Sequence, residues 1–335
     1  MLSRLTRTAR RDTIMVLTND ERKFRSPDKE EEGMDKIRVA VVGFGHVSQE
    51  AVQAVQASPD MELAGVVLRN PEKARVLKGE RPELEVVTDV ERLGPVQVAI
   101  LGIASRAVPE VAPGYLEKGI NTVDSFDIHG KPVMELRASL GAAAKAGNSV
   151  AVISAGWDPG TDSVVRAVME TIAPRGITYT NFGPGMSMGH TVAIKALEGV
   201  EDALSVTIPI GTGLHRRLIY VKTRPGYDFD SVTARIKADP YFSHDECVFY
   251  PAEDIPALQD MGHGVHMERK GVSGASHNQR MEFIMSVMNP AATAQVMVSA
   301  ARASTRQKPG CYTLLEIPPI DCLCGERDAL LARLV

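Results

Sequence analysis

The segment at residues 38–48 (RVAVVGFGHVS) is the feature that most limits the folds open to this chain. Its apolar start, residues 38–42, is typical of a strand buried on both faces, and the glycine turn that follows opens a helix. Gly43 permits a tight turn, and Gly45 lets the backbone approach a pyrophosphate whose charge rests on the helix N-terminus. The segment predicts a Rossmann-type domain that binds a nicotinamide dinucleotide.

Ser48 stands where that fingerprint usually has its third glycine. Serine is still small enough for the helix to pack closely on the strand, and its hydroxyl can bond the backbone. We therefore keep the dinucleotide interpretation, with a structural turn in another parallel-sheet protein as the alternative.

Strand and helix patterns alternate after Met34, as in a parallel sheet with helices on both faces. We expect further strands at residues 63–68, 96–103, 121–124 and 149–154, and helices at residues 48–57, 108–118 and 133–146. The fold class is thus α/β, with a Rossmann-type doubly wound parallel sheet.

The pattern changes beyond residue 160, where longer and more alternating strands are expected at residues 179–182, 204–210, 217–223 and 265–270. They predict a second, α+β domain with a mixed sheet, used for substrate binding and dimerisation. A late helix at residues 290–306 is expected to return to the first domain. The expected division is a cofactor domain at residues 34–158, a substrate-binding and dimerisation domain at 159–288 and a C-terminal segment at 289–335.

Residues 1–33 differ from the rest of the chain. They have an Arg- and Thr-rich start and an acidic run at residues 28–32 (DKEEE), with little apolar periodicity. Such a segment buries too little apolar surface to order itself, so we expect a disordered N-terminal extension.

The composition argues against several classes of partner. Charged residues make up 24% of the chain and the net charge is −4, without the basic field that nucleic acid attracts. No apolar run reaches the roughly 18 residues of a membrane span and no signal-peptide pattern opens the chain, so we expect a cytoplasmic protein without a membrane partner. The cysteines match no common zinc or disulfide framework, so we expect no metal and free thiols at Cys247, Cys311, Cys322 and Cys324.

The end of the second expected strand points to NADP rather than NAD. NAD enzymes usually place an acid there for the ribose hydroxyls, whereas this chain has Leu68, Arg69 and Asn70. The charged fork of Arg69 suits a 2′-phosphate, and a solvated surface arginine is the alternative. The small residues of the loop at 102–106 (GIASR) allow the ribose and nicotinamide to lie against the backbone.

Two unusual segments follow expected sheet strands, at residues 124–129 (DSFDIH) and 154–160 (SAGWDPG), and a third lies at residues 181–190 (NFGPGMSMGH). Ligands of open parallel sheets bind at the carboxyl ends of the strands, so Asp127 and Asp158 converge where the nicotinamide is expected. Carboxylates at that place suit an ammonium group. Trp157, the only tryptophan, is either a pocket wall or a buried structural residue.

Five motifs extend this pattern: VDSFDIHG at 123–130, SAGWDPGTDS at 154–163, TYTNFGPGMSMGH at 178–190, DMGHGVHMERKGVSG at 260–274 and PGCYTLLEIPPID at 309–321. Over residues 34–335 the chain resembles the meso-diaminopimelate dehydrogenases, most closely the branch with broader tolerance for D-amino acids. His46 and Ser48 depart from the asparagine and glycine usual in that family, which affects the expected phosphate geometry.

The resemblance implies a site for NADP(H) and a site for a small amino acid substrate. The cofactor is expected at Gly43, Phe44, Gly45, His46, Val47, Leu68, Arg69, Asn70, Gly102, Ile103, Ala104, Ser105, Ser125, Phe126, Asp127, Ala155, Gly156, Trp157, Asp158 and Pro159. The D-configured centre of the substrate is expected at Asp127, Trp157, Asp158, Phe182, Met188 and Gly189, and the remote L-centre at Thr207, Arg217, His263 and Asn289.

The residue types at the remote centre agree with this assignment. Arg217 and His263 supply donors for a carboxylate, while Thr207 and Asn289 are small orienting groups. Taken alone, His263 is also consistent with a turn residue and Asn289 with a helix N-cap. The sequence also leaves Arg216 as an alternative to its neighbour Arg217 for the arginine that binds the carboxylate.

The implied reaction is reversible oxidative deamination of the D-centre of meso-2,6-diaminopimelate to L-2-amino-6-oxopimelate and ammonia, in lysine and peptidoglycan-precursor metabolism. No lysine lies in an obvious base position, so Asp158 is the first choice as catalytic proton carrier, followed by Asp127 or a bound water. The alternatives are a broad-range NADP-dependent D-amino acid dehydrogenase, another Rossmann oxidoreductase of the dihydrodipicolinate reductase or glucose-fructose type, and a non-catalytic NADPH sensor. A homodimer is expected.

Overall fold

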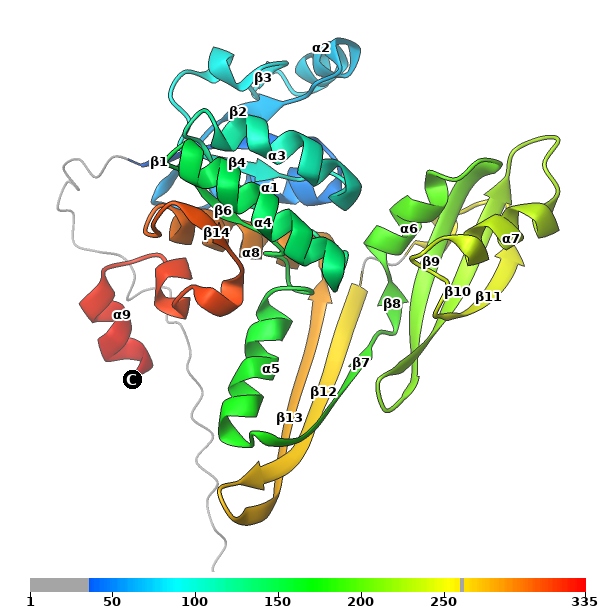
Figure 1. The fold of residues 1–335 in the computed structure, drawn as a ribbon. Helices are drawn as coiled ribbons and strands as arrows, with labels where there is room; N and C mark the ends of the chain where they lie inside the picture. Colours follow the sequence, from blue (N-terminus) through cyan, green and yellow to red (C-terminus); the bar gives the residue numbers. More distant parts are fainter. Residues whose placement is uncertain (1–35, 260–261) are drawn as a thin grey trace, which may run out of the picture. The chain divides into compact units, whose positions relative to one another are not determined.

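The computed structural model describes residues 36–259 and 262–335, so the extension expected at residues 1–33 lies outside the described residues. A seven-stranded sheet forms the first half of the fold (Figure 1). Its strands, all parallel, run in the spatial order β14 (Gly310–Tyr312), β6 (Val150–Val152), β5 (Asn121–Asp124), β4 (Val98–Leu101), β1 (Ile37–Val42), β2 (Met61–Val67) and β3 (Val86–Val87). This confirms the Rossmann-type fold.

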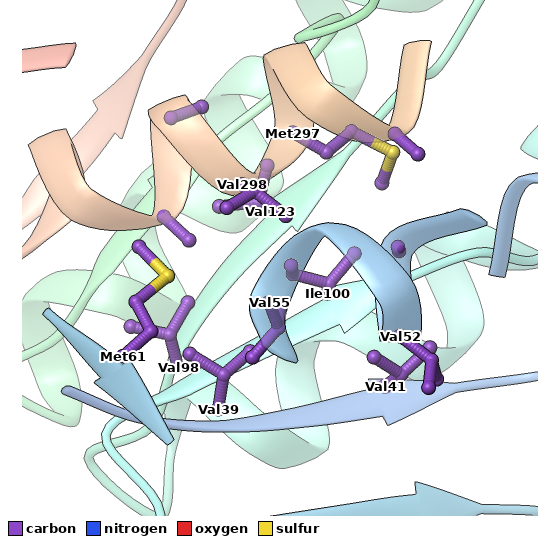
Figure 2. Packing of buried hydrophobic residues seen from close by; sticks show 14 of the residues in the cluster. Val39, Val41, Val52, Val55, Met61, Val98, Ile100, Val123, Met297 and Val298 are labelled. Atoms are coloured by element: carbon purple, nitrogen blue, oxygen red, sulfur yellow. The ribbon is translucent and has the colours of Figure 1, made fainter. Parts of the chain in front are cut away.

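Helices cover both faces of this sheet, because its strands carry Val, Ile and Leu on both sides. One face packs against α3 (Val108–Leu116) and α4 (Lys131–Ala146). The other packs against α1 (His46–Gln56) and α8 (Asn289–Ser304), which is rich in alanine and therefore fits closely. Figure 2 shows Met297 and Val298 of α8 beside Val55 of α1, over the strand residues Val98 and Val123. The late helix thus completes the core that the first strands begin.

Two further sheets follow in the second half of the chain. The first is mixed, in the order β11 (Glu246–Pro251), β10 (Leu214–Thr223), β9 (Val200–Gly211) and β8 (Gly185–Met186). It packs against α6 (Met188–Lys195) and α7 (Phe229–Ala238). The second is antiparallel, in the order β13 (Ser276–Met288), β12 (Gly262–Ser273) and β7 (Arg175–Phe182), with α5 (Thr161–Ile172) on one face. These sheets confirm the mixed second domain.

Several elements lack a clear signal in the sequence. Half of the residues of the helix α2 (Pro71–Glu80) are charged, and α9 (Arg327–Leu334) buries only Leu330. β14 has three residues, too few for periodicity to detect. β13 begins with polar residues and lies at the edge of its sheet, where apolar side chains are not required on both faces.

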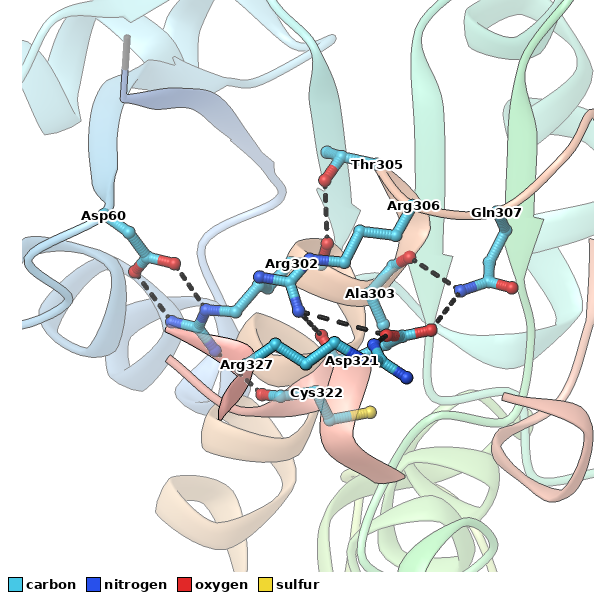
Figure 3. A network of polar contacts seen from close by, with 9 residues as sticks. All are labelled: Asp60, Arg302, Ala303, Thr305, Arg306, Gln307, Asp321, Cys322 and Arg327. Atoms are coloured by element: carbon cyan, nitrogen blue, oxygen red, sulfur yellow. Dashed lines mark hydrogen bonds and ion pairs between the residues drawn. The ribbon is translucent and has the colours of Figure 1, made fainter. Parts of the chain in front are cut away.

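A polar cluster fastens α8 to Asp60, the residue just before β2 (Figure 3). Arg302 is 4% exposed, and its guanidinium donates to Asp60 at 2.5 and 2.8 Å and to the carbonyl oxygen of Cys322 at 2.9 Å. Asp321 accepts hydrogen bonds from Gln307 and Arg327, at 3.1 Å each. Burial raises the pKa of Asp60, but the hydrogen bonds and charge of Arg302 outweigh it and hold that pKa below its ordinary value.

Replacement of Arg302 tests this fastening. Arg302→Met leaves the Asp60 carboxylate without its partner, so we expect the free energy of unfolding in urea to fall by about 3 kcal/mol. The matched control is Arg137→Met, because Arg137 pairs with Glu316 at a half-exposed site and its loss costs about 1 kcal/mol or less. Equal losses for the two variants would contradict the prediction.

Candidate active site

The glycine turn leaves open space at the N-terminus of α1. Gly43 has a φ of +92°, and a Cβ there would lie 2.6 Å from the carbonyl oxygen of Gly102. Gly45 is the N-cap of α1, and a Cβ on it would meet nothing within 4 Å. The Ser48 hydroxyl donates to the carbonyl oxygen of Gly102 at 2.9 Å, as its position predicted. This geometry fits a pyrophosphate that rests on the backbone N–H groups of the first turn.

The end of β2 offers a second anion site. The Arg69 side chain is 63% exposed, and within residues 36–259 and 262–335 its one ion pair is with Glu110, at 4.0 Å, so its guanidinium is available to a ligand. Asn70 accepts hydrogen bonds from the backbone N–H groups of Glu72, at 2.9 Å, and Lys73, at 3.2 Å. The Asn70 side chain therefore caps α2 and fixes the helix end next to Arg69.

Asp124 joins the two loops that carry the candidate catalytic residues. Its carboxylate is fully buried at the end of β5 and accepts from the backbone N–H groups of Phe126, at 2.9 Å, and Ser154, at 3.2 Å. Burial raises the pKa of Asp124 to about 6. The buried carboxyl thus holds the loops after β5 and β6 side by side, which brings the segments of Asp127 and Asp158 together.

Asp127 is held by donors from both halves of the fold. Its Oδ1 accepts from the Ser105 hydroxyl at 2.7 Å and from the Tyr241 hydroxyl at 3.0 Å. A Cβ on Gly189 would lie 2.1 Å from Oδ2, so any larger residue there would displace this carboxylate from its observed position. The structure therefore brings together Ser105, Asp127 and Gly189 as the sequence placed them, and adds Tyr241.

Tyr241 is itself anchored by charged groups. Arg106 donates to both oxygens of Asp239, at 3.1 and 3.3 Å, and lies 5.1 Å from the centre of the Tyr241 ring. Asp239 also accepts from the backbone N–H of Tyr241 at 2.9 Å. Burial, followed by the charge of Asp127, raises the pKa of Tyr241 above its ordinary value. The hydroxyl is therefore protonated at neutral pH and donates to Asp127.

Asp158 has a different environment. Burial raises its pKa well above the ordinary value, and the carboxylates of Asp162 and Asp127 raise it further, while Arg166 opposes them. Asp162 is buried, pairs with Arg166 and accepts from the backbone N–H of Gly160 at 3.1 Å. A carboxyl group with a raised pKa is suited to carry a proton near neutral pH.

Aromatic residues form one wall beyond these carboxylates. The buried Trp157 donates from Nε1 to Asn289 Oδ1 at 2.8 Å, and its ring centre lies 5.3 Å from that of His263 and 6.3 Å from that of Phe182. The N-cap of α8 is Met288, and Asn289 makes no cap hydrogen bond. The N-cap interpretation of Asn289 was therefore wrong, because its side chain is directed to Trp157.

The remote residues also come together. Arg217 donates from Nη1 to the Thr207 hydroxyl at 2.5 Å and from Nε to Asp245 Oδ2 at 2.6 Å. His263 is buried, and burial, with the charge of Arg217 as a further cause, lowers its pKa to about 4. Arg216 instead pairs with Glu246 at an exposed position. Arg217 is therefore the arginine of this cluster.

Some residues that the sequence analysis placed at the site have side chains that pack in the protein core instead. Met188 packs against the apolar cluster of Met186, Leu204 and Ile255. Ala155 is fully buried, and Phe126 packs in the core beside a cavity of about 150 Å³ that Pro159 and Ser154 also line. The backbone N–H of Ala155 donates to the carbonyl oxygen of Asp124 at 2.7 Å, so this residue supports the loop and has no exposed surface for a cofactor.

The sequence did not identify Tyr241, Asp245 and His190 as site residues. His190 has its Nδ1 2.8 Å from the Ser187 hydroxyl, and burial, followed by the charge of Arg217, lowers its pKa to about 3. His190 is the last residue of the motif at residues 178–190, and this motif was the one signal in the sequence that could have identified it. Tyr241 and Asp245 lie in turns without periodicity, so nothing local marks them.

The described residues, 36–259 and 262–335, contain neither a metal site nor a membrane-spanning helix. No cluster of three or more His, Cys, Asp or Glu side chains among them could hold a metal ion. No helix in that part of the chain is long and apolar enough to cross a bilayer.

Comparisons with known proteins match both halves of the chain. The model of the oxidoreductase family with an NAD-binding Rossmann fold matches residues 37–153, and that of the diaminopimelic acid dehydrogenase C-terminal domain matches residues 156–289. The meso-diaminopimelate D-dehydrogenase of Bacteroides fragilis is 53% identical over 90% of this chain and 100% of its own. That of Ureibacillus thermosphaericus is 34% identical over 85% of this chain and 95% of its own.

Solved structures agree with these matches. The diaminopimelate dehydrogenase of C. glutamicum, in complex with DAP, has a TM-score of 0.78 and 28% identity. An engineered D-amino acid dehydrogenase bound to NADP+ has a TM-score of 0.80 and 27% identity. Each match covers 90% of this chain and 100% of the other chain.

Proposed function

Because the chain belongs to the meso-diaminopimelate D-dehydrogenase family, we propose that it oxidatively deaminates the D-centre of meso-2,6-diaminopimelate to L-2-amino-6-oxopimelate and ammonia. The observation that carries the proposal is the match to the Bacteroides fragilis enzyme along that enzyme's whole length. The geometry supports it, since the Asp127 carboxylate suits an ammonium group and Arg217 suits a distant carboxylate.

We propose NADP+ as the cofactor, and the residues fit it. The open N-terminus of α1 suits the pyrophosphate, and the exposed Arg69 beside the capped α2 suits a 2′-phosphate. A relative of known structure binds NADP+. When bound, NADP+ supplies the acceptor for the hydride that leaves Cα of the D-centre.

Asp127 and Asp158 have separate roles in the reaction. Asp127, fixed by Ser105 and Tyr241, orients the ammonium group of the D-centre, so that the Cα hydrogen faces the cofactor. The ammonium group first gives up a proton to solvent, loss of the hydride from Cα then leaves an iminium ion, and water adds to its carbon to release ammonia and the keto acid. Asp158, with its raised pKa, accepts and returns the proton of this water.

We also propose a homodimer. The apolar surface of α8 packs within the chain beside α1, so it is not available as a contact between subunits. Ile284 and Ile177 are exposed on the face of the three-stranded sheet opposite α5, since Val265 and Met267 fill the covered face. That open face, on which the exposed isoleucines lie among ion pairs such as that of Arg280 with Glu268, is the proposed contact between subunits.

A substrate panel tests the proposed reaction. We expect NADPH to form from NADP+ with meso-diaminopimelate, and much more slowly with D-alanine or D-lysine. Comparable rates with all three would favour the second candidate, a broad-range D-amino acid dehydrogenase, which similarity to an engineered enzyme of that kind supports. No turnover with any D-amino acid would contradict both functions.

Substitution of Arg69 tests the cofactor. We expect Arg69→Ala to lower kcat/KM for NADP+ by about 10- to 100-fold, because a charged hydrogen bond to phosphate is lost, and to leave the value for NAD+ nearly unchanged. Arg75→Ala is the control, since Arg75 is an exposed arginine on α2, the helix that follows Arg69. An equal effect on both cofactors would remove Arg69 from the phosphate site.

Substitution of Asp158 tests the proton carrier. In deamination, activity should fall as pH drops through the raised pKa of Asp158, because its protonated form cannot accept a proton. Asp158→Ala should lower kcat by about 100-fold and abolish this acidic limb in a pH profile of kcat. If turnover is unchanged, Asp158 is not the carrier.

A further inference from the structure

The pair of Arg217 and Asp245 has unused hydrogen-bonding capacity on both sides. Arg217 uses Nε for Asp245 Oδ2 and Nη1 for Thr207. Within residues 36–259 and 262–335, neither Arg217 Nη2 nor Asp245 Oδ1 makes a hydrogen bond. The two side chains are 12% and 25% exposed, so they are mostly shielded from water yet reachable.

The strand pairing fixes this arrangement. Arg217 on β10 lies beside Thr207 on β9 and beside Cys247 on the parallel strand β11. Asp245 immediately precedes β11, so the register brings its carboxylate next to the guanidinium. The pair is therefore set by the sheet and not by a flexible surface contact.

The charge of Asp245 is unexpected for a site that binds only a carboxylate. A carboxylate beside the arginine repels the anionic ligand and competes for the guanidinium. The same carboxylate is complementary to a head group that carries both an ammonium and a carboxylate. A positive and a negative side chain, each with one free position, match an α-amino acid centre.

The neighbouring histidines add no further charge. His190 Nε2 lies 3.9 Å from Asp245 Oδ2, and His215 and His263 also surround the pair. Burial is the first cause that lowers the pKa of each histidine, and the charge of Arg217 contributes to all three shifts. They are neutral at neutral pH, so Arg217 and Asp245 are left as the charged groups that face each other.

We propose that Asp245 is a specificity-determining residue that binds the ammonium group of the remote L-centre through Oδ1, while Arg217 Nη2 binds the carboxylate of the same centre. This rests on the proposed function, with meso-diaminopimelate as the substrate. Asp245 then makes the enzyme select substrates whose far end is a complete amino acid, against those that end in a carboxylate alone.

The test compares two substrates of equal length. D-2-aminopimelate has the remote carboxylate of meso-diaminopimelate and lacks its remote amino group. For Asp245→Asn we expect kcat/KM for meso-diaminopimelate to fall by about 10- to 100-fold, mainly through KM, because a charge-assisted contact is lost. For D-2-aminopimelate we expect an unchanged or higher value, which also reports that the variant is folded.

Two further variants complete the design. Glu246→Gln removes the adjacent, exposed acid and should leave the preference between the substrates unchanged. Arg217→Met should weaken both substrates, since both carry the remote carboxylate. Equal losses on both substrates for Asp245→Asn would overturn the assignment and reduce Asp245 to a support for Arg217. If the unmodified enzyme does not turn over meso-diaminopimelate, the proposed function itself fails, together with this inference.

Discussion

The close approach of Gly43, Ser48 and Gly102 is the contact on which the rest of the site depends. Side chains at Gly43 or Gly102 would collide with atoms of the neighbouring strand end or helix, so β1, α1 and β4 meet at backbone distance. That distance decides where the N-terminus of α1 points and where the loop after β4 begins. The same loop carries Ser105, which fixes Asp127, so a steric constraint in the nucleotide turn also positions the carboxylate at the substrate.

The two roles that we propose for Asp127 and Asp158 differ, although both residues are carboxylates. Asp127 receives two hydroxyl donors, which favour an oriented acceptor for an ammonium group. Asp158 instead faces burial and other acids, which favour proton uptake. Neighbouring groups, and not the identity of the residue, separate the roles.

Much of this could be read from the sequence, for physical reasons. The strand at residues 121–124 was predicted with its observed bounds, because it continues the alternation of strand and helix patterns, although Val123 is its only apolar residue. The pairs of Trp157 with Asn289 and of Arg217 with Thr207 join residues that the sequence had assigned to the substrate site. Tyr241 was missed because its partner Asp127 lies 114 residues away, and only the packing of the second half of the chain brings them together. Asp245 was missed because its role depends on a parallel register between β10 and β11 that no local pattern encodes.

The fastening of α8 by Arg302 has a consequence for how the protein is made. Asp60 and Arg302 are separated by 242 residues, and α8 fills the same apolar face as α1. While the chain emerges from the ribosome, the first strands can pair, but half of one face remains uncovered until the last part of the chain is synthesised. The cofactor-binding half is therefore first in sequence and last to be finished, with the entire second half translated in between. Until α8 is in place, the valines and isoleucines of the sheet face that it covers need another partner to shield them from water and from other chains.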